Sequence, residues 1–578
     1  MSGNDETEKQ KKQEASETVE LQQQEEKESA ERTLRERIAF PILSEEQIAQ
    51  FERFAACRTF DDGETLFEAG ETDFGFFVVT RGEVEIIERS SGEPRRVALH
   101  GPGEFTGDVD MLSGKPALVS AVARGATSVY EVACDDIQSL ITELPDLGER
   151  IMRAFIARRE LLIASDFEGV KVIGDSFSAD AHQIREFLAK NQIPSTWIDV
   201  ETDKDVGAML RRFGVTEKDL PVVVADDERL FRNPSIRALA DALGVRRPPD
   251  DCVYDLVVVG AGPAGLAAAV YGASEGLNTL VLEGIGPGGQ AGSSSKIENY
   301  LGFPTGLSGD ELAKRATLQA EKFGARFSSP SQVTGLTFAG DRTIVLLEEE
   351  ERVEAACVLI ATGARYRTLE AEGREKFEGA GIYYSATPTE AQICSDSSIA
   401  IVGGGNSAGQ AAMYMSEHVK KVYLLLKEGD LHTFMSSYLA QRIEGCETID
   451  VRTGIEITAF EGKDHLEAVV LKECETDATE RLAIAAAFIF IGADPCTAWL
   501  PEEIATDKRG YILTGRVAAR SPHWSEDRAP FYLETSRPGV FAAGDVRADS
   551  VKRVASAVGE GAMAVQFVHE YRKVREEE

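Results

Sequence analysis

The stretch DLVVVGAGPAGLAAAVYGASEGLNTLVLE, Asp255 to Glu283, decides the fold of the C-terminal half of the chain. It opens with a short apolar run typical of a buried strand and continues through a glycine-rich turn into a helix of small residues. A second apolar run follows and ends at Glu283. The glycines Gly260, Gly262 and Gly265 stand in the spacing G-x-G-x-x-G. The order of strand, turn, helix and strand predicts a Rossmann-like α/β unit.

Each part of this unit has a physical role in holding a dinucleotide. Gly260 permits the tight turn, Gly262 lets a pyrophosphate approach the backbone, and Gly265 lets helix and strand pack closely. The start of the helix offers unpaired N–H groups to the phosphates, and Glu283 can accept a hydrogen bond from a ribose hydroxyl. Glycines that only permitted tight packing would explain neither this acid nor the order of the elements. The unit therefore predicts a bound dinucleotide.

Further segments indicate which dinucleotide binds. A second glycine cluster at Gly286 to Gly292 is followed by IENYLGFP at Ile297 to Pro304. The runs Ala361 to Gly363 and Gly539 to Asp545 stand further along the chain. Over roughly residues 254–571 the sequence resembles the thioredoxin reductase family of flavoproteins, in which the corresponding segments wrap FAD.

The resemblance implies an FAD-binding domain in two parts, residues 253–380 and 498–578. Residues 283–290 and 545–554 are expected to line the FAD, with Asp545 holding its ribityl or phosphate region. The FAD-binding residues expected from the fingerprint and the resemblance are Gly260, Gly262, Pro263, Ala264, Gly265, Glu283, Gly288, Gly289, Gln290, Asn299, Gly363, Gly544, Asp545, Lys552, Arg553 and Val554.

A second fingerprint lies in Ser398 to Gly409, where the glycine turn reads G-x-G-x-x-A. Two such units are the organisation of a flavoprotein in which a nicotinamide nucleotide passes hydride to flavin N5. An inherited but empty domain is the alternative. The predicted NAD(P)-binding domain spans residues 381–497. Its expected binding residues are Gly403, Gly405, Asn406, Ser407, Ala408 and Lys427.

The choice between NADPH and NADH stays open. The family's reader of the 2′-phosphate is a His-Arg-Arg triplet, and this chain has Leu426, Lys427 and Glu428 there. One cation beside an acid is a poor match for a dianionic phosphate. NADH, or weak binding of either nucleotide, is therefore compatible with the sequence.

The largest departure from the family lies just before this domain. Thioredoxin reductases carry the redox motif C-A-T-C there, and this chain has Ser385 to Pro388, with both cysteines replaced. Serine and proline form no disulfide, so the usual relay from flavin to dithiol cannot run. Cys394 is the nearest thiol and is either a single-thiol acceptor or, as we favour, a buried inert residue. No side chain is assigned a catalytic role.

The N-terminal part of the chain has a different pattern. Residues 1–33 are almost all polar or charged, which predicts a disordered tail. Residues 34–166 contain short β-type runs broken by glycines and closed by helices, as in a β-roll. This segment resembles the cyclic nucleotide-binding domain family, which grips its ligand with a Gly-Glu pair and an Arg. Gly107–Asp108 stands for the pair and Ala117 for the Arg, so tight cyclic nucleotide binding is not expected, although Lys115 could supply a point charge.

Residues 167–245 follow a β-α-β-α-β order that resembles the thioredoxin or glutaredoxin fold, with Pro221 where that family has a cis-proline. The turn Asp175 to Ala179 lacks the family's cysteines. Because disulfide exchange needs a thiolate, the domain is expected to be redox-inactive. Residues 246–252 contain two prolines and several charges and are expected to form a linker.

Composition narrows the class of protein. The 578 residues are too many for one core, and the formal charge of −36 argues against binding nucleic acid or anionic membranes. There is no run of 18 apolar residues and the N-terminus is hydrophilic, so neither a membrane span nor a secretory signal is expected. The eight cysteines contain no C-x-x-C, which excludes a local redox pair and a local zinc site, and no metal is expected. A cytoplasmic protein with reduced thiols is the expectation.

The sequence therefore predicts a multidomain protein with a β-roll, a small thioredoxin-like α/β domain and two Rossmann-like domains that bind FAD and NADPH or NADH. The predicted function is hydride transfer from NAD(P)H to FAD and onward to an unidentified protein or small acceptor. One alternative is a thioredoxin-disulfide reductase that uses other cysteines. Another is a flavin-binding regulatory or scaffold protein without turnover. The family resemblance also suggests a homodimer.

Overall fold

The computed structural model describes most of the chain between residues 35 and 577, which divides into two compact units, Met1–Phe167 and Glu168–Glu578. The predicted tail at residues 1–33 lies outside the described residues, as do Glu298, Glu428 and two residues of the turn at 175–179. Within that range the residues not described are 89–93, 165–168, 176–177, 201–205, 207–209, 211–213, 226–228, 295, 298, 428 and 464.

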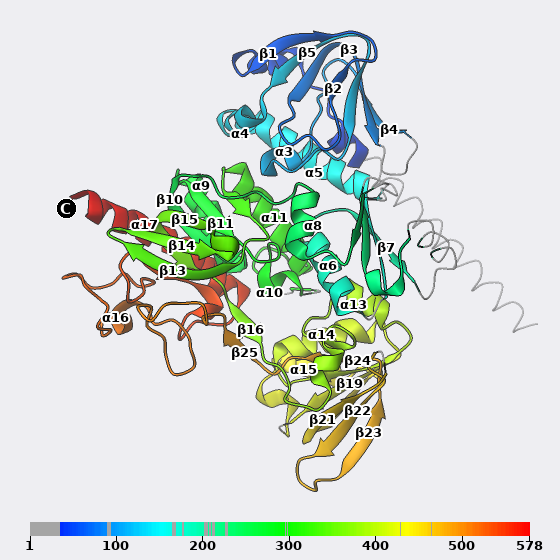
Figure 1. Ribbon diagram of the computed structural model, residues 1–578, viewed down its shortest axis with the longest axis vertical. Coiled ribbons are helices and arrows are strands. Elements are labelled where there is room, and N and C mark those ends of the chain that lie inside the picture. The colour runs from blue at the N-terminus through cyan, green and yellow to red at the C-terminus, as the bar shows by residue number, and fades with distance from the viewer. Residues whose placement is uncertain are drawn as a thin grey trace, which may run out of the picture. The chain divides into compact units, whose positions relative to one another are not determined.

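The first unit is an antiparallel β-roll closed by helices (Figure 1). Its strands lie in the order β1-β5-β3-β4, with β2 paired to β5, and the rings of Phe76, Phe105 and Phe155 pack together in the core. The elements are β1 (Ala55–Phe60), β2 (Thr65–Phe67), β3 (Phe76–Glu88), β4 (Arg95–His100), β5 (Ser120–Val132), α2 (Glu45–Ala49), η1 (Gln50–Arg53), α3 (Asp110–Ser113), α4 (Cys134–Glu143) and α5 (Pro145–Ala164).

The second unit begins with a small α/β module that contains a four-stranded mixed sheet. The strand order is β7-β6-β8-β9, with β6 parallel to β7 and antiparallel to β8. Apolar residues at helical spacing, Ile184, Phe187 and Leu188, pack α6 onto the sheet. The Leu220–Pro221 peptide bond is cis. The elements are β6 (Val170–Gly174), α6 (Ala179–Lys190), β7 (Ser195–Asp199), η2 (Glu217–Asp219), β8 (Val222–Ala225), β9 (Arg229–Arg232) and α8 (Ile236–Ala242).

A first nucleotide-binding-type domain follows, and its parallel strands run in the order β12-β11-β10-β15-β26. Helices α9, α11 and α17 cover one face of this sheet through small and apolar side chains. Strands β14 and β13 extend antiparallel from the first half of β15. The elements are β10 (Val253–Val259), α9 (Pro263–Ser274), β11 (Thr279–Leu282), α10 (Gly289–Gly292), α11 (Gly309–Lys322), β12 (Arg326–Ser328), β13 (Val333–Ala339), β14 (Arg342–Leu347), η3 (Glu348–Glu350), β15 (Arg352–Ile360), α16 (Gly515–Ala518), β26 (Val540–Ala542), η5 (Gly544–Val546) and α17 (Val554–Glu577).

The second domain of this type repeats the plan with a parallel sheet in the order β17-β24-β18-β19-β20. Helices α13, α14 and α15 pack on one face, and an antiparallel sheet of β21, β22 and β23 packs on the other. Strands β16 and β25 connect the two domains as an antiparallel pair. The elements are β16 (Ala364–Tyr366), α12 (Arg374–Phe377), β17 (Ile382–Tyr383), α13 (Pro388–Ile393), β18 (Ser398–Val402), α14 (Asn406–Ser416), β19 (Lys421–Leu426), η4 (Leu431–Thr433), α15 (Ser437–Glu444), β20 (Ile449–Thr453), β21 (Ile455–Glu461), β22 (Ala468–Glu473), β23 (Thr479–Ala483), β24 (Ala486–Ile489) and β25 (Ala493–Pro495).

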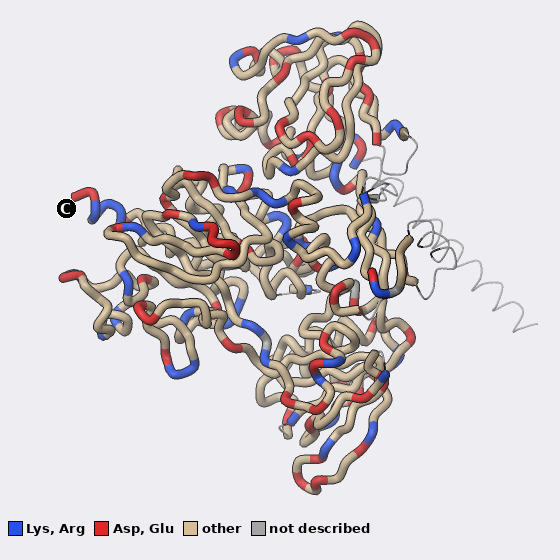
Figure 2. Tube along the Cα trace, viewed as in Figure 1, with Lys and Arg blue, Asp and Glu red and all other residues tan. Residues whose placement is uncertain are grey.

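Charge is spread over the elements rather than gathered on one of them. Figure 2 shows acidic and basic residues on elements throughout the described chain, and the full sequence has acidic residues in excess. Among the helices that the structure describes, none has the length and apolar character needed to cross a membrane.

Candidate dinucleotide-binding cleft

One large cleft, with a volume of about 1490 Å³, is lined by residues of both dinucleotide-binding-type domains. The predicted binding residues that line it are Gly260, Gly262, Pro263, Ala264, Glu283, Gly289, Gln290, Asn299, Gly363, Gly403, Gly405, Asn406, Ser407, Lys427, Gly544, Asp545, Lys552, Arg553 and Val554. The structure thus brings together nearly all of the residues that the two fingerprints and the family resemblance single out, from segments far apart in the sequence.

Three predicted binding residues are not among the residues that line the cleft: Gly265, Gly288 and Ala408. Gly265 lies behind the turn, where an added Cβ would stand 1.8 Å from the carbonyl oxygen of Gly260. Its role is therefore to let α9 pack against the turn and not to touch a ligand. Ala408 holds the matching position in α14 and is fully buried.

The first glycine turn is shaped by backbone contacts that exclude side chains. Gly260 has a φ of +103°, and an added Cβ would come within 2.6 Å of the oxygen of Ala361. Gly262 caps α9, and Pro263 occupies the first helical position, where its missing N–H costs nothing. A Cβ on Gly262 would meet no atom closer than 3.9 Å, so the cleft leaves room beside the N-terminus of α9. This open, amide-rich turn fits a pyrophosphate.

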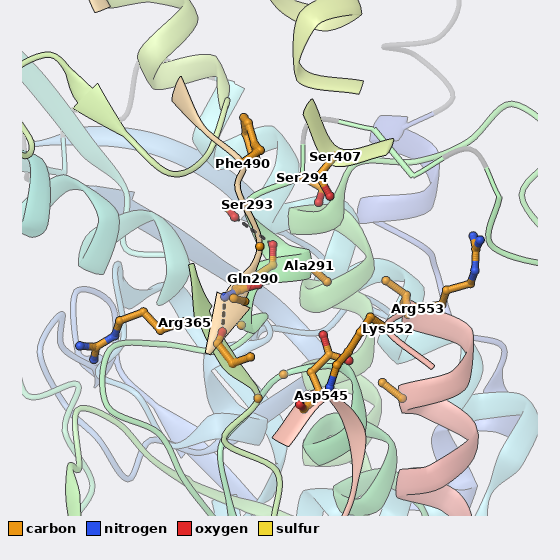
Figure 3. Close-up of a pocket in the computed structure, with 18 of the residues that line it drawn as sticks. Gln290, Ala291, Ser293, Ser294, Arg365, Ser407, Phe490, Asp545, Lys552 and Arg553 are labelled. Atoms are coloured by element: carbon orange, nitrogen blue, oxygen red, sulfur yellow. Dashed lines mark hydrogen bonds between the residues drawn. The ribbon is translucent and has the colours of Figure 1, made fainter. Parts of the chain in front are cut away.

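The second glycine cluster packs directly against this turn. The amide of Gly288 donates to the oxygen of Ala261 at 2.8 Å, and a Cβ on Gly289 would lie 2.9 Å from the Cα of Gly262. The next side chain, Gln290, donates through Nε2 to the carbonyl oxygen of Ala364 (Figure 3). These contacts bind the cluster at Gly286 to Gly292 to both the first turn and the strand that leads to the second domain.

Glu283 has the position and partners of a ribose acceptor. It follows β11, and its Oε2 accepts from the amide of Ala261 at 2.7 Å, while its Oε1 accepts from the amide of Ile285 at 3.3 Å. The carboxylate is thereby held at the rim of the glycine turn and half-exposed to the cleft. An ionised carboxylate has about four acceptor sites, so it can still accept from a ligand hydroxyl.

The C-terminal part of the first domain supplies a cation and an acid. Asp545 belongs to η5, and burial raises the pKa of its carboxyl group. Lys552 lies beside Asp545 (Figure 3), and its Nζ donates to the Asp545 carbonyl oxygen and to Ser550 Oγ at 2.9 Å. Arg553 directly precedes α17, on the opposite side of the pocket in Figure 3 from Arg365. The cleft therefore has positive charge available for an anionic ligand.

The second glycine turn has the same backbone form. Gly403 has a φ of +136°, and an added Cβ would lie 2.3 Å from the oxygen of Phe490. Gly405 caps α14, and the side-chain oxygen of Asn406 accepts from the amide of Ser436 at 2.8 Å. This turn therefore also presents a helix N-terminus to the cleft.

Lys427 is less available to an anionic ligand than its position in the sequence implies, because it forms an ion pair. Its Nζ lies 2.7 Å from Glu456 Oε2, across the gap between β19 and β21. The hydrogen bond from Lys427 lowers the pKa of Glu456, so the carboxylate stays ionised and the pair is neutral overall. Asp430 also lines this end of the cleft. This end of the cleft thus combines one cation with two acidic residues.

The segment that replaces the family's redox motif lies at the cleft. Ser385 lines it, whereas Pro388 begins α13 as its first residue. Thr387 donates to the carboxylate of Glu390 through its amide at 2.7 Å and also through its hydroxyl. The segment is therefore a regular helix start without any nucleophilic sulfur.

None of the eight cysteines, all of which are described, forms a disulfide. Cys394 is buried and does not line the cleft, and burial raises its pKa to about 12. Cys496, which sequence reasoning did not single out, does line the cleft, and burial raises its pKa too. Both environments disfavour the thiolate that thiol chemistry requires.

Ile285 lies in the segment 283–290 that was expected to line the FAD, and it does line the cleft, whereas several other residues that line the cleft carry no local sequence signal. They come from loops and strand ends whose place is set by contacts between domains, and two come from the small module. They include Glu186, Lys190, Ser293, Ser294, Arg365, Tyr384, Gln410, Phe434, Phe490 and Tyr511.

In the β-roll, the candidate ligand-binding positions Asp108 and Ala117 contact other residues of the same domain. Asp108 accepts from Arg159 Nη2 at 2.7 Å through one oxygen and from the amide of Asp110 at 2.9 Å through the other. Ala117 is buried, and its backbone pairs with residues 70 and 71. Ala117 therefore offers no cation to a cyclic phosphate, and the Asp108 carboxylate is held by Arg159 and the amide of Asp110.

The cleft contains two glycine turns, and Glu283 follows the second strand of the first of these units. This arrangement is that of an oxidoreductase that binds two dinucleotides. Residues 254–561, more than half of the chain, match the pyridine nucleotide-disulphide oxidoreductase family, and the chain belongs to that family. Residues 57–143 match the cyclic nucleotide-binding domain family.

Within the oxidoreductase family the chain is similar to thioredoxin reductases, which use FAD and NADPH. It is 33% identical over 320 residues to thioredoxin reductase of Treponema pallidum (strain Nichols), covering 55% of this chain and 97% of the relative. The match to thioredoxin reductase of Peptoclostridium litorale is 31% over 325 residues, with 55% and 97% coverage. The crystal structure of Lactococcus lactis thioredoxin reductase in the FR conformation aligns with a TM-score of 0.50 at 30% identity, covering 55% of this chain and 98% of that one. The chain is therefore a flavin-dependent pyridine nucleotide oxidoreductase resembling thioredoxin reductase.

Proposed function

We propose that this oxidoreductase takes electrons from a nicotinamide nucleotide and delivers them to its acceptor without a dithiol relay. The observation that carries the proposal is the serine and proline at Ser385 and Pro388, the positions of the family's two redox cysteines. The nearest thiol, Cys394, is buried with a pKa of about 12. Neither the segment nor the thiol offers a nucleophile for disulfide exchange.

The residues of the cleft fit FAD. The turn at Gly260 and Gly262 would hold the pyrophosphate, and Glu283 would hold a ribose hydroxyl. Asp545, with Lys552 beside it, would hold the ribityl or phosphate region of FAD. FAD, when bound, supplies the redox chemistry by accepting hydride from the nicotinamide and passing electrons onward. The protein binds and orients the two nucleotides, and its second glycine turn at Gly403 and Gly405 would hold the nicotinamide nucleotide.

Anaerobic stopped-flow mixing with NADH and with NADPH tests this function. The flavin absorbance of the purified holoprotein is expected to bleach with at least one of them. Cys394→Ala is expected to bleach at the wild-type rate, because this residue lies outside the cleft. A wild-type protein that contains no flavin after incubation with FAD, or that neither nucleotide reduces, would contradict the proposal.

A thioredoxin-disulfide reductase that uses other cysteines is the second candidate function. It is favoured by the names of the relatives and by the place of Cys496 in the cleft. It predicts NAD(P)H-driven reduction of a disulfide reporter that is lost when Cys496 or Cys394 is replaced by alanine. A flavin-binding scaffold without turnover is a third reading, and it predicts slow photoreduction but no reduction by either nucleotide.

The choice of coenzyme follows from the pairing of Lys427. Because Glu456 neutralises this lysine, we expect the 2′-phosphate of NADPH to gain little, so that NADH is bound at least as well. Relatives of this family use NADPH, and the paired lysine is the feature that would set this chain apart.

The N-terminal parts complete the proposal. We assign the module at residues 167–245 to the thioredoxin-like fold, supported by the strand order β7-β6-β8-β9, and expect it to be redox-inactive. The β-roll at residues 34–166 is proposed not to bind cAMP or cGMP tightly, because Ala117 stands where the family has its phosphate-binding Arg. The other proposed boundaries are a linker at 246–252, an FAD domain at 253–380 and 498–578, and an NAD(P) domain at 381–497, in a cytoplasmic homodimer.

A further inference from the structure

The small α/β module reaches the dinucleotide cleft although it lies outside the segment that matches the oxidoreductase family. Glu186 and Lys190 of α6 are among the residues that line the cleft, whereas the family match begins at residue 254. They stand on one face of the helix at i and i+4 and form an ion pair of 2.8 Å between Lys190 Nζ and Glu186 Oε1. The pair belongs to the site and not to the solvated face of α6.

Direct packing holds this end of α6 against the segment that follows Glu283. Asn191, which is 6% exposed, donates from Nδ2 to the carbonyl oxygen of Ile285 at 2.8 Å. An added Cβ on Gly286 would come within 2.7 Å of both Lys190 Cβ and Asn191 Nδ2. The helix and this loop are therefore in backbone-level contact, and the position of Lys190 is set by that contact.

A second set of contacts fastens the module to the same domain. Arg246, which is 7% exposed on its side chain, donates to Glu351 Oε2 at 2.6 Å, and Arg237 donates to Glu351 Oε1 at 3.0 Å. Two arginines that share one carboxylate form a network, which is harder to break than a single surface pair. The module is thus anchored at two separate places on the first dinucleotide-binding domain.

The place of this contact along the cleft identifies the part of the ligand concerned. In a fingerprint of this kind, the acid at the end of the second strand marks the adenosine ribose. Glu283 is that acid, and Ile285 and Gly286 directly follow it. A side chain that lines the cleft next to these residues would face the adenosine end of FAD and not its flavin ring.

We infer that α6 of the module forms the outer wall of the adenosine end of the FAD site, with Lys190 and Glu186 as positioning residues. The aliphatic stem of Lys190 suits the flat face of a purine, and the carboxylate of Glu186 can accept from a purine amino group or a ribose hydroxyl. The inference rests on the proposed function, because it requires FAD in this cleft. It gives the module a role in cofactor retention that needs no cysteine.

The test is the affinity of the full-length apoprotein for FAD, measured from the quenching of flavin fluorescence. Lys190→Ala is expected to weaken binding about tenfold, and the double change Glu186→Ala with Lys190→Ala is expected to weaken it further. Lys314→Ala is the matched control, because Lys314 also forms an i,i+4 pair, with Asp310 at 2.7 Å on α11, and does not line the cleft. The control is expected to bind FAD within about twofold of wild type.

A readout of stability separates a positioning role from general damage. The thermal midpoint of the apoprotein is expected to be the same in wild type and Lys190→Ala, while the rise in midpoint on adding FAD is expected to be smaller in the variant. The visible spectrum of the bound flavin should keep its shape, because the contact is at the other end of the cofactor.

The outcomes also distinguish the two proposals. Equal FAD affinity in wild type, Lys190→Ala and the double variant would overturn the inference and leave the proposed function intact. A loss of FAD affinity in Lys190→Ala that is matched by a lower midpoint without FAD would overturn it as well. A wild-type protein that binds no FAD would overturn both.

Discussion

The two glycine turns of the second unit share a backbone and differ in what stands at the end of the following strand. Gly260 and Gly403 both take a left-handed φ against a carbonyl oxygen of a neighbouring strand. After the first turn, the carboxylate of Glu283 is held by two backbone amides and faces the cleft. After the second turn, Lys427 is paired with Glu456. The same fold thus ends in a carboxylate held by amides in one copy and in an exposed ion pair in the other.

The difference teaches that the turn gives a general affinity for a dinucleotide, whereas side chains at the strand end decide which dinucleotide it is. A turn built from amides and a helix start recognises any pyrophosphate. A carboxylate selects a free ribose hydroxyl, and a free cation would select a 2′-phosphate. In this chain we propose that Glu283 keeps the first of these roles and that the pairing of Lys427 with Glu456 weakens the second.

The largest expected effect concerns Gly265, the third glycine of the first turn, which lets α9 pack against that turn. Gly265→Ala would place a Cβ 1.8 Å from the oxygen of Gly260, so α9 must move away from the turn. We expect this variant to be purified without flavin or not to fold. Gly405→Ala is the control, because its Cβ would meet no atom within 4 Å, and it should keep its flavin. Flavin content per chain is the measurement, and a flavin-replete Gly265→Ala would contradict the argument.

The next effect concerns the acid of the first turn. Glu283→Gln removes the charge that would accept from the ribose, and a hydrogen bond to a charged group is worth about 1.5–3 kcal/mol, or roughly tenfold to a hundredfold in affinity. We expect the dissociation constant of FAD to rise by that factor. Glu275→Gln, which removes the partner of His569 at the end of α9, should leave it unchanged. An unchanged constant in Glu283→Gln would exclude this carboxylate from the site.

A smaller effect tests the pairing at the second turn. Glu456→Gln would remove the carboxylate that Lys427 contacts at 2.7 Å and should improve binding of NADPH relative to NADH, by about tenfold, because the lysine then meets the 2′-phosphate without this competing acid. Equilibrium titration of each nucleotide against the holoprotein measures the ratio. Glu480→Gln serves as the control, since Glu480 pairs with Arg452 instead. A ratio that stays the same in Glu456→Gln would mean that the ion pair does not govern the choice of coenzyme.

The smallest effect concerns two buried thiols. Cys357 lies in the first dinucleotide-binding-type domain and Cys394 in the second. Burial raises the pKa of Cys394 to about 12 from an ordinary value of 9.0. The pKa of Cys394 is higher in the folded state than in the unfolded state, so the protonated thiol contributes to the free energy of unfolding. This contribution is fully present below about pH 9 and is lost as the pH rises through about 12. Iodoacetamide at pH 8 should therefore modify the exposed Cys57, Cys252 and Cys474 and spare the two buried thiols, as mass spectrometry would measure. Rapid labelling of Cys394 would show it to be accessible and reactive.

Much of the fold could be predicted because its signals are local. The two glycine turns are set by short runs such as Leu256 to Gly265, and the structure places a strand, turn and helix there. Strands β1 (Ala55–Phe60) and β9 (Arg229–Arg232) were not predicted, since both are largely exposed or only half-buried and show no clean alternation of apolar residues. Pairing across the sheet, and not sequence pattern, holds these two strands.

The parts of the site that sequence could not supply come from contacts between distant segments. The ion pair of Lys427 with Glu456 joins two strands of one domain, and the contact of Asn191 with Ile285 joins two domains. Neither contact is accompanied by a periodic pattern or a motif in the sequence around the residues that form it. Glu186 and Lys190 read in sequence as an ordinary surface pair on a helix, and only the packing of α6 against Gly286 brings them to the cleft.

The account depends most directly on electron uptake by the flavin without help from sulfur. Anaerobic titration of the holoprotein with the better nicotinamide nucleotide should reach full bleaching at about one equivalent per flavin, before and after the accessible thiols are alkylated. A requirement for a second equivalent that alkylation of the reduced protein abolishes would reveal a dithiol acting with the flavin, and the account would be wrong.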